Sequence, residues 1–347
     1  MAAAKSYLET DRQVRSILED VRKGIFKSVY LLMGEEPYYP EMVCSAIEEN
    51  CLQEWERDFN QTVCYGADVD AEAVITAARR FPMMAERQLV VVKEAQQMKT
   101  LEDLSIYCQQ PLNSTVLVIL MHGASADKRK ALYKAVLKTG VIVDSLALRD
   151  FEMAPWINSY YESRGLRIHP EACQLLAEHA GTDLGKIAVE TDKLLKNLPE
   201  GTVEVSAEDI EKNVGVSRQF SIFELTRCLS FRDAPRALKT ARYIGEAPRF
   251  ALPMAMAPLF THFNRILRYH ALLKKGGTSP GDIAKALGVN PYFMREYDAA
   301  IRNYPLERCM NAISLLTEYD FKGKGGDAGE ASPSELLVEL IAKLLNI

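Results

Sequence analysis

Short apolar runs rich in β-branched residues constrain the fold of this chain more than any other feature. The clearest runs are residues 89–93 and 116–121, and weaker ones occupy 29–33, 62–65 and 141–145. An uninterrupted apolar run without alternation is typical of a parallel strand that is buried on both faces. Because helical patterns separate these runs, the first part of the chain is predicted to be an α/β domain with a parallel sheet.

From residue 150 onward the pattern changes to helices with clear start and stop signals. Pro170 begins a helix that ends at Gly181, and Asp183 caps the next one. A chain of 347 residues is long for one core. We therefore expect three domains: an α/β domain over 1–148, a small helical domain over 149–217 and an all-α domain over 218–347.

Composition bounds the class of protein. Hydrophobic residues make up 48% of the chain and charged residues 26%, and no apolar run reaches the roughly 18 residues that span a bilayer. No apolar signal-peptide core follows Met1, so we expect a cytoplasmic protein without a membrane partner. The seven cysteines are scattered and odd in number, and the five histidines lack triad partners, so we predict no metal site, cofactor or catalytic residue.

Charge is uneven along the chain. The net charge is −5, yet residues 218–275 hold eleven Lys or Arg and three Asp or Glu, a balance of +8. Such a segment could face nucleic acid or an acidic partner, or it could be a solvated helix surface. In the same part of the chain, residues 220–231 and 335–345 carry apolar side chains on more than one helical face, which indicates burial within the chain or between chains.

A strand, a glycine and a helix follow one another at Gly34, where a phosphate-binding loop would lie. The loop motif requires Gly, Lys and Ser or Thr where this sequence has Tyr39-Pro40-Glu41. Glu35 and Glu36 also place negative charge where phosphates would bind. We therefore interpret Gly34, Glu35 and Glu36 as a degenerate nucleotide loop, and a cryptic ATPase is kept as an alternative.

The segment that precedes the 89–93 run holds two adjacent methionines. It reads Phe81-Pro82-Met83-Met84-Ala85-Glu86-Arg87-Gln88 and is predicted to start with a one-turn helix at Pro82. Adjacent residues lie about 100° apart on a helix, so both methionines cannot easily turn inward. Either at least one of them docks into a partner protein, for which flexible methionine is suited, or the pair belongs to the core.

Residues 281–297 have the pattern of a helix-turn-helix, with Gly288 at the turn. A DNA reader needs polar and basic side chains on its second helix. Here that helix begins Tyr292-Phe293-Met294-Arg295-Glu296-Tyr297-Asp298, and its acids would repel phosphates. Helix packing is favoured, and a DNA-binding regulator remains the alternative function.

Five motifs in order resemble one family, the delta subunit of the bacterial DNA polymerase III clamp loader. They are the strand and Gly-Glu-Glu of 30–38, the Met-Met and Arg-Gln segment of 81–93, and three later stretches at 183–194, 220–225 and 319–323. In the position of the family's Leu-Phe-like pair, this chain has Met83 and Met84.

The resemblance implies a degenerate AAA+ (RecA-like) domain, a helical lid and a helical collar domain for oligomerisation. It also implies a mechanical role without catalysis by this chain itself, within the DNA polymerase III holoenzyme. The partners would be the sliding clamp (beta subunit), the ATPase subunits gamma or tau, delta prime, and primed DNA in the assembled loader. Clamp binding would use Phe81, Pro82, Met83 and Met84.

Overall fold

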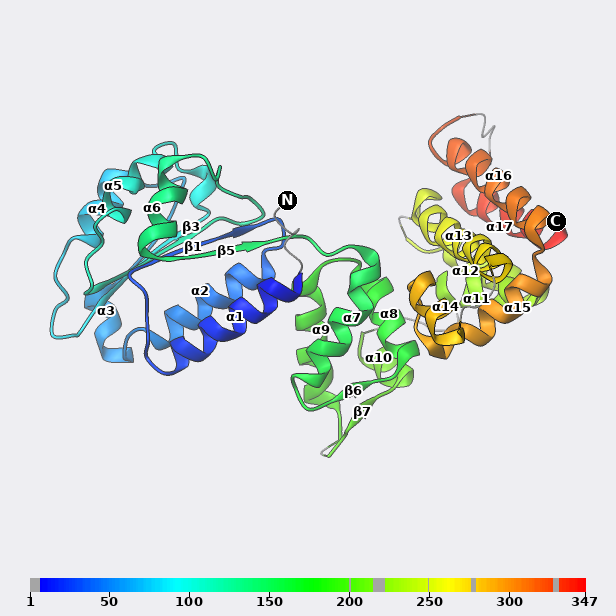
Figure 1. Cartoon of the computed structure of the whole chain (residues 1–347), viewed down its shortest axis with the longest axis horizontal. Coiled ribbons are helices and arrows are strands. Elements are labelled where there is room, and N and C mark those ends of the chain that lie inside the picture. Colours follow the sequence, from blue (N-terminus) through cyan, green and yellow to red (C-terminus); the bar gives the residue numbers. More distant parts are fainter. Residues whose placement is uncertain (1–6, 200, 215–221, 249, 276–278, 327–330) are drawn as a thin grey trace. The chain divides into compact units, whose positions relative to one another are not determined.

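The computed structural model describes residues 7–199, 201–214, 222–248, 250–275, 279–326 and 331–347. The chain forms two compact units, which are described separately (Figure 1). Unit 1 holds Met1–Arg149 and Thr182–Gly185, and unit 2 holds Asp150–Gly181 and Lys186–Ile347. The predicted boundary between residues 217 and 218 lies outside the described residues, so the three-domain organisation stays a prediction.

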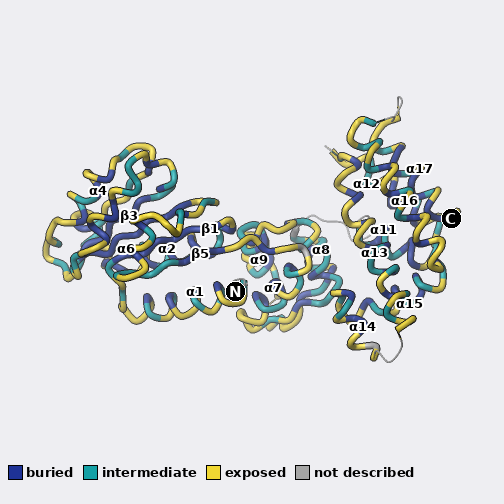
Figure 2. The backbone as a smooth tube through the Cα atoms, turned by 45° about the horizontal axis from the view of Figure 1, so that its top comes forward, coloured by how far each residue is buried: buried dark blue, intermediate teal, exposed yellow. Residues whose placement is uncertain are grey.

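Unit 1 is built on a five-stranded parallel sheet in the order β2-β3-β4-β1-β5. Leu31 of β1 is in register with Ile119 of β4 and Ile142 of β5. The strands β1, β3 and β4 are almost entirely buried (Figure 2), which explains their uninterrupted apolar sequences. The predicted parallel α/β sheet is confirmed, with β1 Val29–Gly34, β2 Gln61–Tyr65, β3 Gln88–Lys93, β4 Thr115–Leu120 and β5 Val141–Ser145.

Helices cover both faces of this sheet (Figure 1). The helices α1 Tyr7–Arg22 and α2 Tyr38–Asn50 pack together on one face. On the other face, one apolar cluster joins the sheet to α4 Ala71–Ala78, α5 Ser105–Cys108 and α6 Ala131–Thr139. The remaining short elements are η1 Glu54–Glu56, α3 Arg57–Asn60, η2 Ala95–Gln97 and η3 Leu101–Leu104.

Unit 2 is predominantly helical, as predicted. Its first part has a two-stranded parallel pair, β6 Arg167–Ile168 with β7 Glu204–Val205. The helices around this pair are α7 Asp150–Glu162, α8 Pro170–Ala180, α10 Ala207–Val214 and α9 Leu184–Asn197, whose first two residues belong to unit 1. The helix predicted from Pro170 to Gly181 is present, and Gly181 ends it with a φ of 64°. The second part comprises α11 Ile222–Phe231, α12 Ala234–Gly245, α13 Pro253–Lys275, α14 Pro280–Leu287, η5 Pro291–Phe293, α15 Met294–Asn303, α16 Leu306–Gly323 and α17 Pro333–Asn346. Among the described residues, no helix combines the length and the apolar character that a membrane crossing requires.

The last helix, α17, lies in the hydrophobic core that the helices of the second part of unit 2 share. Ser332 caps it through a capping box with Glu335. Its apolar residues on more than one face are buried inside unit 2, where α17 packs against α12 and α16. The wide apolar surface predicted for residues 335–345 is therefore explained by burial within the chain.

Three arginines of the basic segment bind the carbonyl ends of helices. Arg232 donates to the carbonyl oxygens of Leu345 and Ile347 at the end of α17. Arg265 and Arg268 donate to carbonyl oxygens at the end of α14. The last carbonyls of a helix have no partner within the helix and carry partial negative charge. Part of the positive surplus thus serves helix capping, which favours a structural explanation for these side chains.

The helix-turn-helix pattern forms α14, η5 and α15, with Gly288 in a left-handed turn at a φ of 65°. Tyr297 is buried in the core, and the hydroxyl of Tyr269 donates to Asp298 over 2.6 Å. The carboxylate oxygen Oε1 of Glu296 lies 3.6 Å from the guanidinium nitrogen Nε of Arg227 in α11. These three side chains of α15 are engaged inside unit 2, which favours packing over DNA recognition.

We predict that Glu296 makes unit 2 less stable as the pH rises. Burial raises the pKa of Glu296 to about 7, although Arg227 acts in the opposite direction. Because this folded-state pKa exceeds the unfolded value, the group stabilises the fold fully below about pH 4.5, and the contribution is lost as the pH rises through 7. Glu296→Gln should therefore raise the free energy of unfolding at pH 8 by up to about 3 kcal/mol and have little effect at pH 4.5.

Urea unfolding at several pH values would measure this difference, with Glu307→Gln as a control because Glu307 is an exposed glutamate of the same unit. Equal effects of the two substitutions at all pH values would contradict the assignment.

Candidate functional site

The segment between α4 and β3 lies at the edge of the sheet where the strands begin, near α3 (Figure 1). The one-turn helix predicted at Pro82 is wrong, because residues 83–86 form a bend and Met84 has a left-handed φ of 54°. The physical reason is the side chain of Asn60. It binds both the N–H and the carbonyl of Met83, the groups that a helix would use for its own hydrogen bonds.

The predicted docking residues are strongly exposed. The exposed fraction is 82% for Phe81, 61% for Met83 and 90% for Met84, while Pro82 is half-buried. Single exposed apolar residues are common, but a run of large ones is typical of an interaction surface. The structure thus favours docking over the core interpretation of the methionine pair.

Sequence reasoning missed two aromatic residues that precede Asn60. Trp55 and Phe59 are 63% and 71% exposed, and they belong to η1 and α3. Their spacing of four residues, which places side chains side by side on a helical surface, was the available signal. Because Asn60 is hydrogen-bonded to Met83, these aromatics belong to the same end of unit 1 as the methionines.

Gln88 anchors the start of the segment. Its buried Nε2 lies 2.6 Å from the carbonyl oxygen of Arg80, 3.1 Å from that of Ala78 and 2.9 Å from Oγ1 of Thr115. The Thr115 hydroxyl also donates to Ala78 over 2.8 Å. These carbonyls lie at the end of α4, where helix geometry leaves them without partners. The amide therefore caps α4 from the first residue of β3.

Arg87 anchors the other end of the segment. Its Nη1 donates to the carbonyl of Gly24 over 3.1 Å, and its guanidinium lies 4.9 Å from the ring centre of Phe26. Together, Asn60, Gln88 and Arg87 hold the backbone around the two methionines at three points. Residues 81–87 therefore form a solvent-exposed loop whose backbone is fixed by hydrogen bonds.

The loop that the sequence predicts to be a degenerate nucleotide loop lies at the opposite edge of the sheet, where the strands end. Gly34 has a φ of 138°, and a Cβ atom there would lie 2.0 Å from the carbonyl oxygen of Ser145. Its N–H donates to Ala124 over 2.9 Å. Glycine is required here because the end of β5 approaches so closely, so no phosphate is needed to explain it.

A carboxylate occupies the first turn of the helix after this loop. Glu35 is exposed, but Glu36 is buried, and its Oε1 accepts the N–H of Tyr38 over 3.0 Å. Burial raises the pKa of Glu36, the N–H groups of Tyr38 and Leu184 counteract this, and nearby Asp183 adds to it. At a helix N-terminus, such N–H groups are the ones that a phosphate would use. The N–H of Tyr38, which a phosphate could otherwise use, is therefore already bound by Glu36.

No group of His, Cys, Asp or Glu able to hold a metal ion occurs in the described part of the chain. At the end of β3, the ammonium nitrogen Nζ of Lys93 forms a salt bridge with Oε1 of Glu48 over 3.1 Å.

Comparison with known proteins gives consistent results along the chain. The family model for the DNA polymerase III delta subunit matches residues 30–145, and the model for the C-terminal domain of that subunit matches residues 219–341. DNA polymerase III subunit delta of Bacillus subtilis is 25% identical over 337 residues, which cover 94% of this chain and 95% of that protein. A probable DNA polymerase III subunit delta of Aquifex aeolicus is 22% identical over 306 residues, which cover 84% of this chain and 85% of that protein.

A solved structure agrees. The DNA clamp loader delta protein of Bacillus subtilis superimposes with a TM-score of 0.54 at 25% identity, over 96% of this chain and 100% of that one.

We predict that magnesium ATP leaves the melting temperature of the chain unchanged, because Glu36 fills the helix N-terminus that a nucleotide would need. A ligand at a hundredfold excess over its Kd stabilises a fold by about 2.7 kcal/mol, which is several degrees in Tm. Thermal unfolding with magnesium alone and with magnesium ATP would measure the effect. A reproducible rise with ATP would show that the loop binds nucleotide.

Proposed function

The chain belongs to the family of DNA polymerase III delta subunits, which act in the clamp loader, and we propose that it binds the sliding clamp through Phe81, Pro82, Met83 and Met84. The observation that carries this proposal is the exposure of Met83 and Met84, at 61% and 90%, on a segment whose backbone is hydrogen-bonded to a buried side chain.

The chemistry of the segment suits an apolar pocket. Methionine is unbranched and polarizable, so two of them can adapt to a pocket that they fill. Binding energy in protein interfaces concentrates in a few such anchors, and aromatic residues are frequent among them. The neighbouring ring of Phe81, 82% exposed, supplies the aromatic group that the Met-Met pair lacks.

The division of labour follows from the two edges of the sheet. One edge displays the apolar segment, and the other is filled by Glu36 and by the approach of Ser145 to Gly34. We therefore assign this chain a mechanical role without catalysis, in which it binds the clamp and helps to open it. ATP hydrolysis belongs to the gamma or tau subunits, which assemble with this chain and delta prime around primed DNA.

The two alternative functions are disfavoured by specific contacts. For a cryptic ATPase, the carboxylate of Glu36 stands where phosphates would bind. For a DNA-binding regulator, Glu296 and Asp298 on α15 would meet phosphates, and both make contacts inside unit 2.

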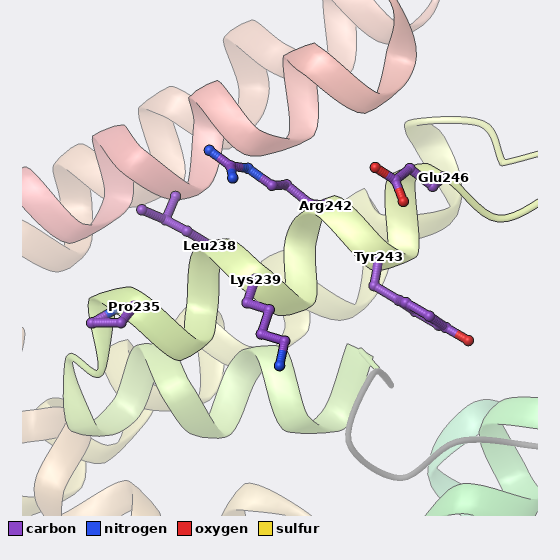
Figure 3. A pocket seen from close by; sticks show the side chains of 6 residues that line it. All are labelled: Pro235, Leu238, Lys239, Arg242, Tyr243 and Glu246. Atoms are coloured by element: carbon purple, nitrogen blue, oxygen red, sulfur yellow. The ribbon is translucent and has the colours of Figure 1, made fainter.

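Assembly with sister subunits is assigned to unit 2. Since the apolar residues of α17 are buried within the unit, they are not available to partners, and other surfaces are considered. A shallow hollow on α12 is one candidate (Figure 3), and Tyr243 is 51% exposed there. Its lining residues are Pro235, Leu238, Lys239, Arg242, Tyr243 and Glu246.

We predict that replacing both Met83 and Met84 with Asp abolishes clamp binding. Loss of one buried anchor costs about 2 kcal/mol or more, roughly thirtyfold in affinity, and two carboxylates add a desolvation cost. Surface plasmon resonance with the organism's own sliding clamp would measure the loss, and circular dichroism would confirm the fold. The matched control replaces Met254 and Met310, exposed methionines of unit 2, with Asp. Clamp affinity equal to wild type in the Met83/Met84 variant would refute the proposal.

We also predict that Tyr243→Asp lowers incorporation into the loader at least tenfold, about 1.4 kcal/mol, and leaves clamp binding intact. Charges on this face would have to be desolvated against a partner helix. Co-expression with the ATPase subunits followed by size-exclusion chromatography would measure assembly. The Met83/Met84 variant is the reciprocal control, since it should assemble but not bind the clamp. Normal assembly of the α12 variant would remove this face from the interface.

A further inference from the structure

We propose that Asn60 is a positioning residue that presets the conformation in which Met83 and Met84 meet the clamp. This inference rests on the proposed function and deepens it. Asn60 ends α3, 23 residues before Met83 in the chain, and only 4% of it is exposed. It touches no clamp in this proposal, and its effect is transmitted through the backbone of Met83.

The amide of Asn60 is fully used. Its Oδ1 accepts the N–H of Met83 over 2.6 Å, and its Nδ2 donates to the carbonyl of Met83 over 3.0 Å. The second hydrogen of Nδ2 serves the carbonyl of Glu56, also at 3.0 Å. An asparagine amide offers two donors and one acceptor oxygen, and all three have partners here. Both polar groups of the Met83 backbone are therefore held by one side chain that is itself tied to α3.

This two-point attachment explains the strained residue that follows. Met84 has a φ of 54°, a region that residues with a side chain seldom adopt. Such a conformation persists only where the surroundings determine it on both sides. Asn60 holds the residue before Met84, and Arg87 and Gln88 hold the chain after it. In an extended chain, neighbouring side chains point to opposite sides. The turn at Met84 interrupts this alternation, so both methionines are exposed to solvent.

The consequence for binding is pre-organisation. A free loop would have to be ordered when it enters a pocket, and the lost backbone and side-chain freedom would be subtracted from the affinity. Here the backbone is ordered before the partner arrives. Because Asn60 is buried, its amide is shielded from water that would compete for its hydrogen bonds.

The residue type is specific. Aspartate has the same shape and would keep an acceptor for the Met83 N–H. Its second oxygen, however, would face the carbonyls of Met83 and Glu56, which now accept from Nδ2. Asn60→Asp should therefore release the carbonyl side of Met83, and Asn60→Ala should release both sides.

The test uses the full chain with Asn60→Asp and Asn60→Ala, so that one variant serves if the other does not fold. We expect clamp affinity to fall about tenfold in either variant, because the loop must be ordered on binding. We also expect the amide of Met83 to lose its protection from hydrogen exchange, while the amide of Val90 in β3 keeps it. This local loss is a readout that a general loss of stability would not give.

The matched control is Val74→Ala, a truncation in the buried face of α4 that should leave clamp affinity unchanged.

The outcomes separate this inference from the proposed function. If the Met83/Met84 double variant loses clamp binding but both Asn60 variants bind within twofold of wild type, the positioning role is wrong and the docking site stands. If Val74→Ala weakens binding as much as the Asn60 variants do, the effect is one of stability and the inference is also wrong. If the Met83/Met84 double variant binds normally, the proposed docking site itself fails.

Discussion

The parallel pairing of β1, β3 and β4 is the constraint on which the rest of unit 1 depends. Parallel strands begin at one edge of a sheet and end at the other, so residues at strand starts and strand ends cannot meet. At the edge where strands end, Gly34 lies against Ser145 and Glu36 turns into the first turn of α2. At the edge where strands begin, the chain before β3 is free to carry an exposed loop. The edge where strands end is thus closed by Ser145 and Glu36, and the edge where strands begin carries the exposed loop. We call the second one the displayed edge.

The displayed edge inverts the usual distribution of residues. Polar Asn60 and Gln88 are buried, and apolar Phe81, Met83 and Met84 are exposed. Burying a polar group is costly unless it is hydrogen-bonded, and the NH2 groups of both amides donate to backbone carbonyls. The exposed apolar side chains have no such compensation within the chain. In the proposed function, this inversion provides a rigid framework for apolar side chains that the clamp would bury.

Much of the fold could be predicted from the sequence, because burial on both faces leaves a direct signature in β1, β3 and β4. Exposure of at least one of Met83 and Met84 could be predicted from their adjacency, as an alternative to burial of the pair in the core. The conformation of their segment could not, since it depends on Asn60, which is distant in sequence and reads as an ordinary polar residue. The charge balance left its two interpretations open for a similar reason. Arg232, Arg265 and Arg268 count as surface cations in a sequence, but they bind helix ends that only the tertiary structure brings to them.

Rigidity at the docking segment connects its structure to mechanical work. A protein shifts the equilibrium between a closed and an open ring only by binding the two states with different affinity. A flexible tether would follow the ring through its movement and bind both states equally, so it would shift nothing, however tightly it bound. A segment held by Asn60, Gln88 and Arg87 cannot follow, because its backbone is tied to α3, α4 and the chain around Gly24. Under the proposed function, strain that a closed ring would have to accept to meet this fixed surface would be relieved on opening. Anchoring the two methionines would then turn binding energy into a preference for the open clamp.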